Sequence, residues 1–302
     1  MSERATIRGV WCATLSPLDG RGGLDHRRNA EHARRLFAAG VDGIAPFGTT
    51  GEGQSFSVAE RKEGLEALID EGIAPSRILA ATGCAALPEA IDLTRHAVEW
   101  GCAGVLVLPP FFWKGVTDDG LYASYAALIE GVADLRLRLY LYHIPQISAV
   151  PVPAAVIERL CVAFPGVVAG VKDSAGDLAH TLALAARFPE LAIFTGHEPH
   201  LPRMLAAGGA GTVCGIANLF PQLLRRLFDG AGTPDGDAAL AAIRAFLDVA
   251  LDYPLMPAFK ALQATLTGDA AWTAVRPPLA PLSATDAETM HERLRRASII
   301  PD

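Results

Sequence analysis

Short apolar runs alternate along this chain with longer runs in which apolar and polar residues are mixed. The short runs are nearly free of charge on both faces, which is typical of strands that are buried on both sides. We expect eight strands of this kind, over residues 9–13, 43–47, 78–82, 104–108, 137–142, 167–171, 192–195 and 211–213.

The longer runs place apolar residues at helical spacing, and several begin at a capping residue and stop at a glycine. Ser57 and Glu60 form a capping-box pattern, and that helix should stop before Gly72. We expect helices over residues 25–39, 57–71, 88–100, 118–133, 153–164, 177–188 and 199–207. The alternation implies a parallel sheet. Eight such units favour an α/β fold of the (β/α)8 type, a TIM barrel, over an open doubly wound sheet.

Two further features bear on the architecture. A dinucleotide-binding sheet would need G-x-G-x-x-G after an early strand, and residues 20–23 have the wrong spacing. Beyond Leu219 the alternation ends, and residues 221–229, 236–251, 257–267 and 284–297 form four predicted helices without strands between them. We therefore expect a barrel over residues 1–229 and a C-terminal helical extension over residues 230–302, packed on the barrel.

Composition narrows the class of partner. The chain has 302 residues, of which 51% are hydrophobic, and a net charge of −7. It can bury a large core, and it offers neither nucleic acid nor an anionic membrane a basic surface. Residues 204–224 are long enough to span a membrane, but their glycines, Asn218 and Pro221 favour a buried strand, a loop and the start of a helix.

Cysteine and histidine spacing limits the cofactor chemistry. The N-terminus lacks the layout of a signal peptide. The five cysteines are odd in number and form no C-x-x-C pair, so we expect reduced thiols and a cytoplasmic location. The eight histidines form no H-x-x-x-H or His/Cys cluster, so no metal is predicted.

Candidate chemistry should lie at the C-terminal ends of the strands, where barrel enzymes carry their active sites. The second strand is followed by Gly48-Thr49-Thr50-Gly51-Glu52-Gly53. The glycines allow close approach of the backbone to a ligand, and the N–H groups with two hydroxyls could hold a carboxylate or a phosphate. A tight loop with threonine caps fits the same residues equally well.

Two tyrosines end the fifth strand. Tyr140 and Tyr142 share one face because their spacing is two, and we expect Tyr142 to reach the mouth of the barrel. A phenol there could pass protons to and from a substrate oxygen. The alternative is an aromatic side chain that only packs inside the barrel.

Lys172 follows the sixth strand directly. A lysine buried at the barrel mouth favours its neutral amine. That amine can attack a ketone and form an iminium, which accepts the electron pair when an adjacent carbon–carbon bond breaks. The alternative is a lysine that reaches out to water or pairs with Asp173.

These three segments, in this order, resemble the dihydrodipicolinate synthase / N-acetylneuraminate lyase family of class I aldolases, and the likeness covers nearly the whole chain. The resemblance implies that Lys172 forms a Schiff base with pyruvate or a pyruvate-derived 2-oxo acid. It implies that Tyr142 is the general acid and base, and that Gly48, Thr49 and Thr50 bind the 2-oxo acid's carboxylate. It also implies no cofactor and no metal, and a homotetramer built as a dimer of dimers.

Two departures from the family pattern argue against its best-known reaction. Members that make dihydrodipicolinate carry a second tyrosine in the loop after the fourth strand, where this chain has Phe112. They also carry an arginine shortly after the fifth-strand motif, where this chain has Ile147. An apolar side chain cannot replace a bidentate clamp on a carboxylate.

The remaining candidate residues belong to the distal part of the pocket. His143 replaces the family's asparagine, and it could orient Tyr142, bind substrate or serve the structure alone. Gly196, His197 and Glu198 correspond approximately to the residues that bind sugar hydroxyls in sialic-acid lyases. Val213 is less polar than a sialic-acid site requires. This mixed pocket suits a 2-oxo-3-deoxy sugar acid, a 4-hydroxy-2-oxo acid or an aromatic aldehyde adduct.

We therefore expect a carbon–carbon lyase or aldolase that cleaves or joins pyruvate and an aldehyde. One alternative keeps the same lysine but acts as a 2-oxo-3-deoxy acid dehydratase or hydratase-aldolase. Dihydrodipicolinate synthesis is a further, disfavoured alternative. A non-catalytic ligand-binding protein of the same fold is the last, because a fold does not fix a function.

Overall fold

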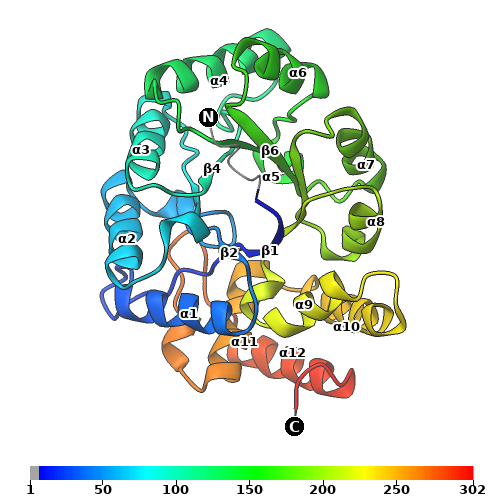
Figure 1. Ribbon diagram of the computed structural model, residues 1–302. Coiled ribbons are helices and arrows are strands. Elements are labelled where there is room, and N and C mark those ends of the chain that lie inside the picture. Colours follow the sequence, from blue (N-terminus) through cyan, green and yellow to red (C-terminus); the bar gives the residue numbers. More distant parts are fainter. Residues whose placement is uncertain (1–6, 302) are drawn as a thin grey trace.

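The computed structural model describes residues 7–301 as eight parallel strands surrounded by helices. The strands form one sheet in the order β2-β1-β8-β7-β6-β5-β4-β3. A parallel bridge between Ile44 and Ile78 joins β2 to β3, so the sheet closes on itself (Figure 1). The predicted (β/α)8 TIM barrel is confirmed. Residues 1–6, for which we predicted no signal peptide, and residue 302 lie outside the described part.

Every predicted strand corresponds to an observed one, with shifts at the ends. Strand β6 runs on through Lys172 to Asp173, and β5 includes His143. Tyr142 pairs with Lys172, and His143 pairs with Asp173. The strands are β1 (Gly9–Cys12), β2 (Gly43–Ile44), β3 (Leu79–Ala81), β4 (Gly104–Val107), β5 (Leu139–His143), β6 (Val168–Asp173), β7 (Ala192–Thr195) and β8 (Gly211–Cys214).

The outer helices also match their predictions, and side-chain caps mark where α1, α2, α4 and α7 begin. Ser57 and Glu60 form the expected capping box. A short helix after β5 was not predicted, because four residues give no readable periodicity. The barrel helices are α1 (His26–Ala38), α2 (Val58–Asp70), α3 (Leu87–Glu99), α4 (Asp118–Val132), α5 (Pro145–Ser148), α6 (Ala154–Ala163), α7 (Leu178–Arg187), α8 (Leu201–Ala206) and α9 (Pro221–Asp229).

Large aromatic side chains fill the barrel interior, and glycines on neighbouring strands make room for them. A Cβ atom on Gly43 would lie 2.2 Å from the ring of Trp11. A Cβ atom on Gly170 would lie 2.3 Å from the carbonyl oxygen of Ala192 and 2.8 Å from the ring of Tyr140. The barrel is therefore a packed core that leaves only its mouth for chemistry.

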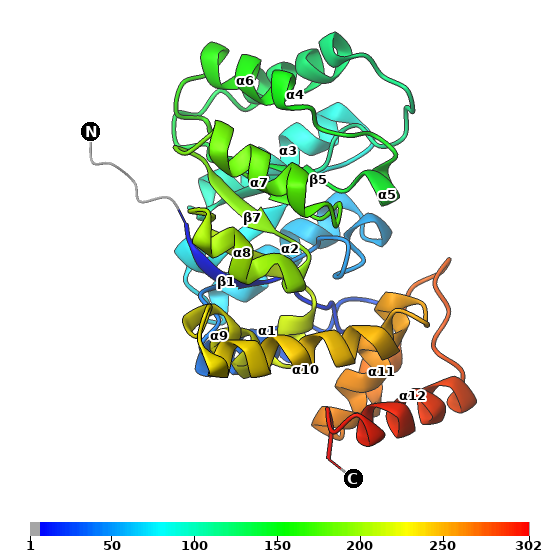
Figure 2. The ribbon, with the colours of Figure 1, turned by 90° about the vertical axis from the view of Figure 1, so that its right-hand side faces the viewer.

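The C-terminal helices α10 (Pro234–Ala250), α11 (Leu255–Thr267) and α12 (Ala284–Arg296) follow the barrel. Figure 2 shows α10 along one side of the barrel, with α11 and α12 next to one end of α10. Trp272 packs edge-on against His32 of α1 at 5.0 Å, which ties this part to the barrel. The division of the chain at residue 230 stays a prediction.

Two smaller expectations concern membranes and thiols. Within residues 7–301, no helix is long and apolar enough to cross a membrane. Residues 204–224 form the end of α8, β8 and the start of α9, as their glycines suggested. The five cysteines are all free.

The packing of Tyr140 against Gly170 predicts a stability effect. We expect Gly170→Ala to lower the free energy of unfolding by about 1–3 kcal/mol, because the new methyl group meets a backbone carbonyl that cannot move aside. Urea denaturation measures the change. Gly20→Ala is the matched control: nothing lies within 4 Å of a Cβ atom there, so its effect should stay within about 0.5 kcal/mol. Equal effects for the two variants would contradict the packing account.

Candidate active site

The side chains of Lys172 and Tyr142 meet at the C-terminal end of the barrel. They come from adjacent strands, β6 and β5, and point inward at the same level. Both are buried, with 4% and 3% of their surface exposed. The Lys172 Nζ atom lies 4.2 Å from the centre of the Tyr142 ring. The two residues predicted to be catalytic are thus brought together in a nearly dry environment.

Polar contacts link the phenol of Tyr142 to the neighbouring loops. Its Oη atom lies 3.4 Å from Thr49 Oγ1, and Lys172 and Ser174 also contact it. Burial alone would raise the pKa of Tyr142, but the charge of Lys172 and these polar contacts outweigh burial and lower the pKa below the ordinary value. A phenol of this kind gives up its proton more readily than free tyrosine, as a general base requires.

The loop after β2 is a closed turn that faces the same pair. Gly53 N–H donates to the Gly48 carbonyl at 3.0 Å, and Glu52 N–H donates to the Thr49 carbonyl at 3.1 Å. Among the described residues, the N–H groups of Thr49 and Thr50 have no protein acceptor. Two free donors beside a hydroxyl make a suitable cradle for a carboxylate.

Gly196, which follows β7, leaves the space that this arrangement needs. A Cβ atom there would lie 1.9 Å from Ser174 Oγ and 3.3 Å from Lys172 Cε. Any side chain at this position would collide with Ser174, and it would crowd the lysine. Gly196 therefore belongs to the wall of the site through its lack of a side chain.

The other predicted pocket residues lie at different depths. Val213 is fully buried in the barrel wall. Phe112, on the loop that follows β4, is 65% exposed, and Ile147, in the short helix α5 that follows β5, is 58% exposed. The Phe112 ring meets Trp113 edge-on at 5.2 Å. Phe112 and Ile147 thus stand at the rim, whereas Val213 lies inside.

His197 and Glu198 also differ in how deeply they are buried. His197 is half-buried and its ring meets His200 edge-on at 4.3 Å. Glu198 is buried, and its carboxyl group contacts the backbone of Ile216 and the thiol of Cys214. Burial raises the pKa of Glu198 above the usual value, against the lowering effects of these contacts and of Lys172. Its side chain therefore connects the loops after β7 and β8.

His143 lies on the face of β5 opposite to Tyr142, because successive side chains of a strand alternate. Its Nδ1 atom accepts a hydrogen bond from Val152 N–H at 3.0 Å, and its ring stacks on His180 at 4.6 Å. Burial and the nearby His180 lower the pKa of His143, although Asp173 opposes them. The side chain packs on the outer face of β5, away from Tyr142 and Lys172. These contacts favour a structural role for His143 over a contact with substrate.

His143, Asp173 and His180 bring potential metal-ligand atoms within 4.8 Å of one another. The chemistry disfavours a metal here. Nδ1 of His143 accepts a hydrogen bond, so in the neutral ring Nε2 carries the proton, and neither nitrogen offers a free lone pair to a metal ion. Asp173 already accepts bonds at 2.8 Å from both His180 Nδ1 and Thr181 Oγ1. These bonds also occupy Asp173, which we had considered as a partner for Lys172.

Sequence reasoning missed two contributors to the site. Phe259 of α11 and Thr50 both lie over Gly215, where an added Cβ atom would be 3.0 Å from the Phe259 ring and 3.2 Å from Thr50 Oγ1. Lys260, the next residue, forms a buried ion pair with Glu52. A single lysine in a helix with no other charged residue was the available signal, and it resembles the signal that singled out Lys172.

Two cavities of the described chain lie away from this pair of residues. One of about 870 Å³ is lined by Arg136, Arg138 and Tyr140, and one of about 700 Å³ by Arg35, Phe220 and other residues of α1, α9 and α10. Neither has Lys172 or Tyr142 in its lining. The candidate site therefore rests on convergent chemistry rather than on volume.

Comparison with known proteins supports the resemblance drawn from the motifs. The model of the dihydrodipicolinate synthetase family matches residues 6–297. An uncharacterized DapA-like lyase from Chloroflexus aurantiacus is 38% identical over 296 residues, 97% of each protein. A 4-hydroxy-tetrahydrodipicolinate synthase from Rhodospirillum centenum is 33% identical over 80% of each protein. The crystal structure of dihydrodipicolinate synthase from Agrobacterium tumefaciens matches with a TM-score of 0.87 and 35% identity, over 95% of this chain and 98% of that one.

The lowered pKa of Tyr142 can be measured from the absorbance of tyrosinate. In a pH titration, we expect one of the five tyrosines to ionise before the others, and Tyr142→Phe to remove that step. Lys172→Met should move the step to higher pH, because burial raises the pKa of Tyr142 and the charge of Lys172 is the main effect that lowers it. Tyr140→Phe is the control, since burial raises the pKa of Tyr140 to about 12. Loss of the early step in that variant would contradict the assignment.

Proposed function

This chain belongs to the dihydrodipicolinate synthetase family, and on that premise we propose that it is a Schiff-base aldolase or lyase acting between pyruvate and an aldehyde. The observation that carries the proposal is the buried amine of Lys172 beside the phenol of Tyr142. A buried amine that lies next to a proton-transfer group is the arrangement that imine formation requires.

The chemistry follows from the contacts of the two side chains. The amine of Lys172, reacting in its unprotonated form, attacks the carbonyl carbon of the 2-oxo acid, and transfer of a proton from the nitrogen to the oxygen gives a carbinolamine. Tyr142 donates a proton to the departing oxygen, water leaves and an iminium remains. In the cleavage direction, Tyr142 then removes the proton from the 4-hydroxyl group, and the C3–C4 bond breaks. Its electron pair enters the iminium as an enamine, and the aldehyde departs.

The loop after β2 supplies the anchor for the other end of the 2-oxo acid. The free N–H groups of Thr49 and Thr50 receive the carboxylate, next to the hydroxyl of Thr49 that contacts Tyr142. In a site this dry, such dipoles act at a low effective dielectric and hold the acid in one orientation. The carbonyl carbon then faces Lys172.

The rim of the pocket bears on the aldehyde half of the substrate. Phe112 and Ile147 offer neither a hydroxyl nor a charge, and the ammonium of Lys114 is engaged by the carbonyls of Phe111 and Ser148. A substrate whose distal end is uncharged suits such a rim. We therefore include a 2-oxo-3-deoxy sugar acid or a 4-hydroxy-2-oxo acid in the proposal. A homotetramer, on the family resemblance, and a cytoplasmic location, on the pattern of the cysteines, belong to the same proposal.

The synthase activity named for the relatives is a second candidate. Their identity to this chain, 33% and 35%, favours it. The missing cation at Ile147 and the missing phenol at Phe112 weigh against it. A dehydratase would use the same lysine but would release water without releasing pyruvate, so product analysis separates the outcomes.

Imine formation can be trapped with borohydride. We expect incubation with pyruvate and borohydride to add one reduced pyruvate unit to the protein, located on Lys172 by peptide mass mapping, and Lys172→Ala to show no addition. Lys114→Ala, which removes an exposed lysine at the same end of the barrel, is the control and should keep the full addition. An unmodified parent protein, or an addition elsewhere, would reject the proposal.

The choice of aldehyde can be tested at the rim. We expect the parent protein to release pyruvate from uncharged-tailed 2-oxo-3-deoxy acids and to condense pyruvate poorly with an aldehyde that carries a carboxylate. Ile147→Arg should raise kcat/KM for the carboxylate-bearing aldehyde by about tenfold or more, since an arginine pairs with it bidentately. Ile147→Gln adds polarity without charge and serves as the control. Efficient use of that aldehyde by the parent would favour the synthase activity instead.

A further inference from the structure

Glu52, the last charged residue of the loop after β2, does not face the barrel mouth. Its backbone adopts the left-handed conformation, with φ of 53°. Its carboxylate forms an ion pair with the ammonium of Lys260, and the two side chains are 1% and 0% exposed. The second oxygen of Glu52 accepts the backbone N–H of Arg276 at 3.1 Å. Two groups of the C-terminal part, the Lys260 ammonium and the Arg276 N–H, thus bind the carboxylate of this loop.

Lys260 is a residue of α11, and it contacts more than Glu52. Its ammonium donates to the Ala274 carbonyl at 2.7 Å as well as pairing with Glu52. The preceding residue, Phe259, lies with Thr50 over Gly215 at the end of β8. One turn of α11 therefore contacts the loop at Glu52, and its Phe259 borders the same space over Gly215 as Thr50 does.

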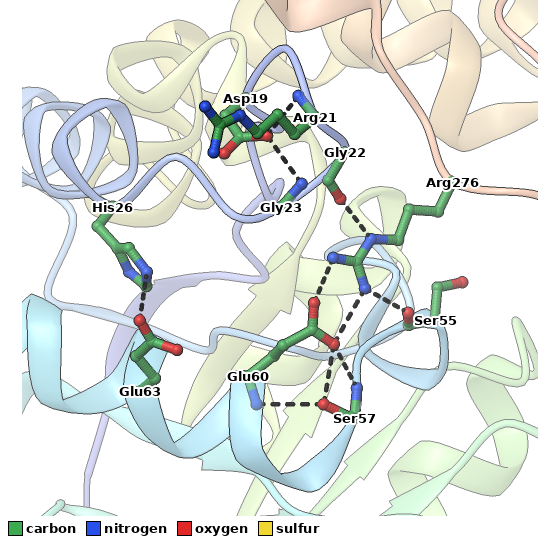
Figure 3. Close-up of polar contacts among 10 residues, drawn as sticks. All are labelled: Asp19, Arg21, Gly22, Gly23, His26, Ser55, Ser57, Glu60, Glu63 and Arg276. Atoms are coloured by element: carbon green, nitrogen blue, oxygen red, sulfur yellow. Dashed lines mark hydrogen bonds and ion pairs between the residues drawn. The ribbon is translucent and has the colours of Figure 1, made fainter.

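Arg276 holds the outer end of the same loop (Figure 3). Its guanidinium donates to the carbonyls of Gly22 at 2.8 Å and Ser55 at 2.7 Å, and it forms an ion pair with Glu60. It lies 4.1 Å over the ring of Phe56. Arg276 thereby joins the loop before α1, the end of the β2 loop and the start of α2.

A buried ion pair is a poor choice where stability alone is needed. Removing two charges from water costs much of what their attraction returns, and apolar pairs of similar size are often equally stable. A directional contact with both groups in one geometry does, however, fix the loop more specifically than apolar packing. The strained backbone of Glu52 needs such support from its surroundings.

We infer that Lys260 is a positioning residue that, through Glu52, holds the N–H groups of Thr49 and Thr50 in place to receive the carboxylate of the 2-oxo acid. The inference rests on the proposed function and deepens it. It assigns part of the substrate affinity to the C-terminal helices, which contribute no reacting group. Loss of the pair should therefore weaken the hold on the carboxylate and leave the amine of Lys172 reactive.

The test compares a double variant with the parent protein. Glu52→Gln/Lys260→Met removes both charges, keeps an acceptor for Arg276 N–H and avoids an isolated buried charge. We expect the pyruvate concentration that half-saturates borohydride trapping to rise about tenfold, while the limiting rate changes less than about threefold. Half-saturation by hydroxyacetone, a ketone without a carboxylate, should not change.

The control removes another contact between the same C-terminal part and the barrel. Asp269 pairs with Arg28 of α1 at 2.6 Å, away from the loop, so Asp269→Asn should leave half-saturation by pyruvate within about twofold of the parent value. If circular dichroism shows that the double variant is unfolded, Glu52→Asp replaces it, because it keeps the charge but shortens the reach, with the same expected shift.

Three results would overturn the inference. The folded variant could keep the parent's half-saturation by pyruvate. Its limiting rate could fall equally with both ketones, which would mean that the damage reaches Lys172. Asp269→Asn could give the same shift as the double variant, which would make the effect one of general stability. A parent protein that is never trapped by pyruvate is a different result, and it rejects the proposed function instead.

Discussion

The burial of the Lys172 amine is the constraint on which the rest of the site depends. An ammonium group deprived of water is costly unless other groups compensate for it. Here the compensation comes from the ring and phenol of Tyr142, which in turn contacts Thr49. The same contacts that make this burial tolerable supply the proton acceptor and the anchor that the proposed reaction needs. The burial of Lys172 is therefore both the energetic cost of this site and the basis of its proposed chemistry.

The closed barrel makes that arrangement possible. Parallel strands end at one rim, so residues far apart in the chain meet there. Tyr140, for which Gly104 and Gly170 leave room, fills the interior below, so the inward side chains at the ends of the strands line the mouth. The C-terminal helices also support this mouth, because Lys260 of α11 pairs with Glu52 in the loop that carries Thr50, and Phe259 lies with Thr50 over Gly215.

Much of this could be predicted from the sequence, for identifiable reasons. Strands buried on both sides read as uncharged runs, so the order of elements was visible, and the rule that strand ends converge placed Lys172, Tyr142 and Thr49 together. The outward direction of His143 also follows from alternation along β5, because Tyr142 points in. Among the three roles that the sequence left open for His143, this direction favours the structural one.

Other features could not be predicted because they depend on contacts between distant segments. Nothing local to Glu198 shows that its carboxyl group turns toward Cys214 and Ile216. Likewise, Glu52 was part of a recognisable motif, but its partner lies more than half the chain away on a helix that carries no motif. The strand β6 extends past its apolar run to include Lys172 and Asp173, since pairing with β5 and β7 overrides the polarity of these residues.

The central claim is that one lysine and one loop together hold a 2-oxo acid. A crystal structure of the protein after pyruvate has been reduced onto it tests this directly. The account predicts a covalent link at Lys172 Nζ, with the carboxylate within hydrogen-bonding distance of the N–H groups of Thr49 and Thr50. A link at another lysine, or a carboxylate turned away from that loop, would contradict it.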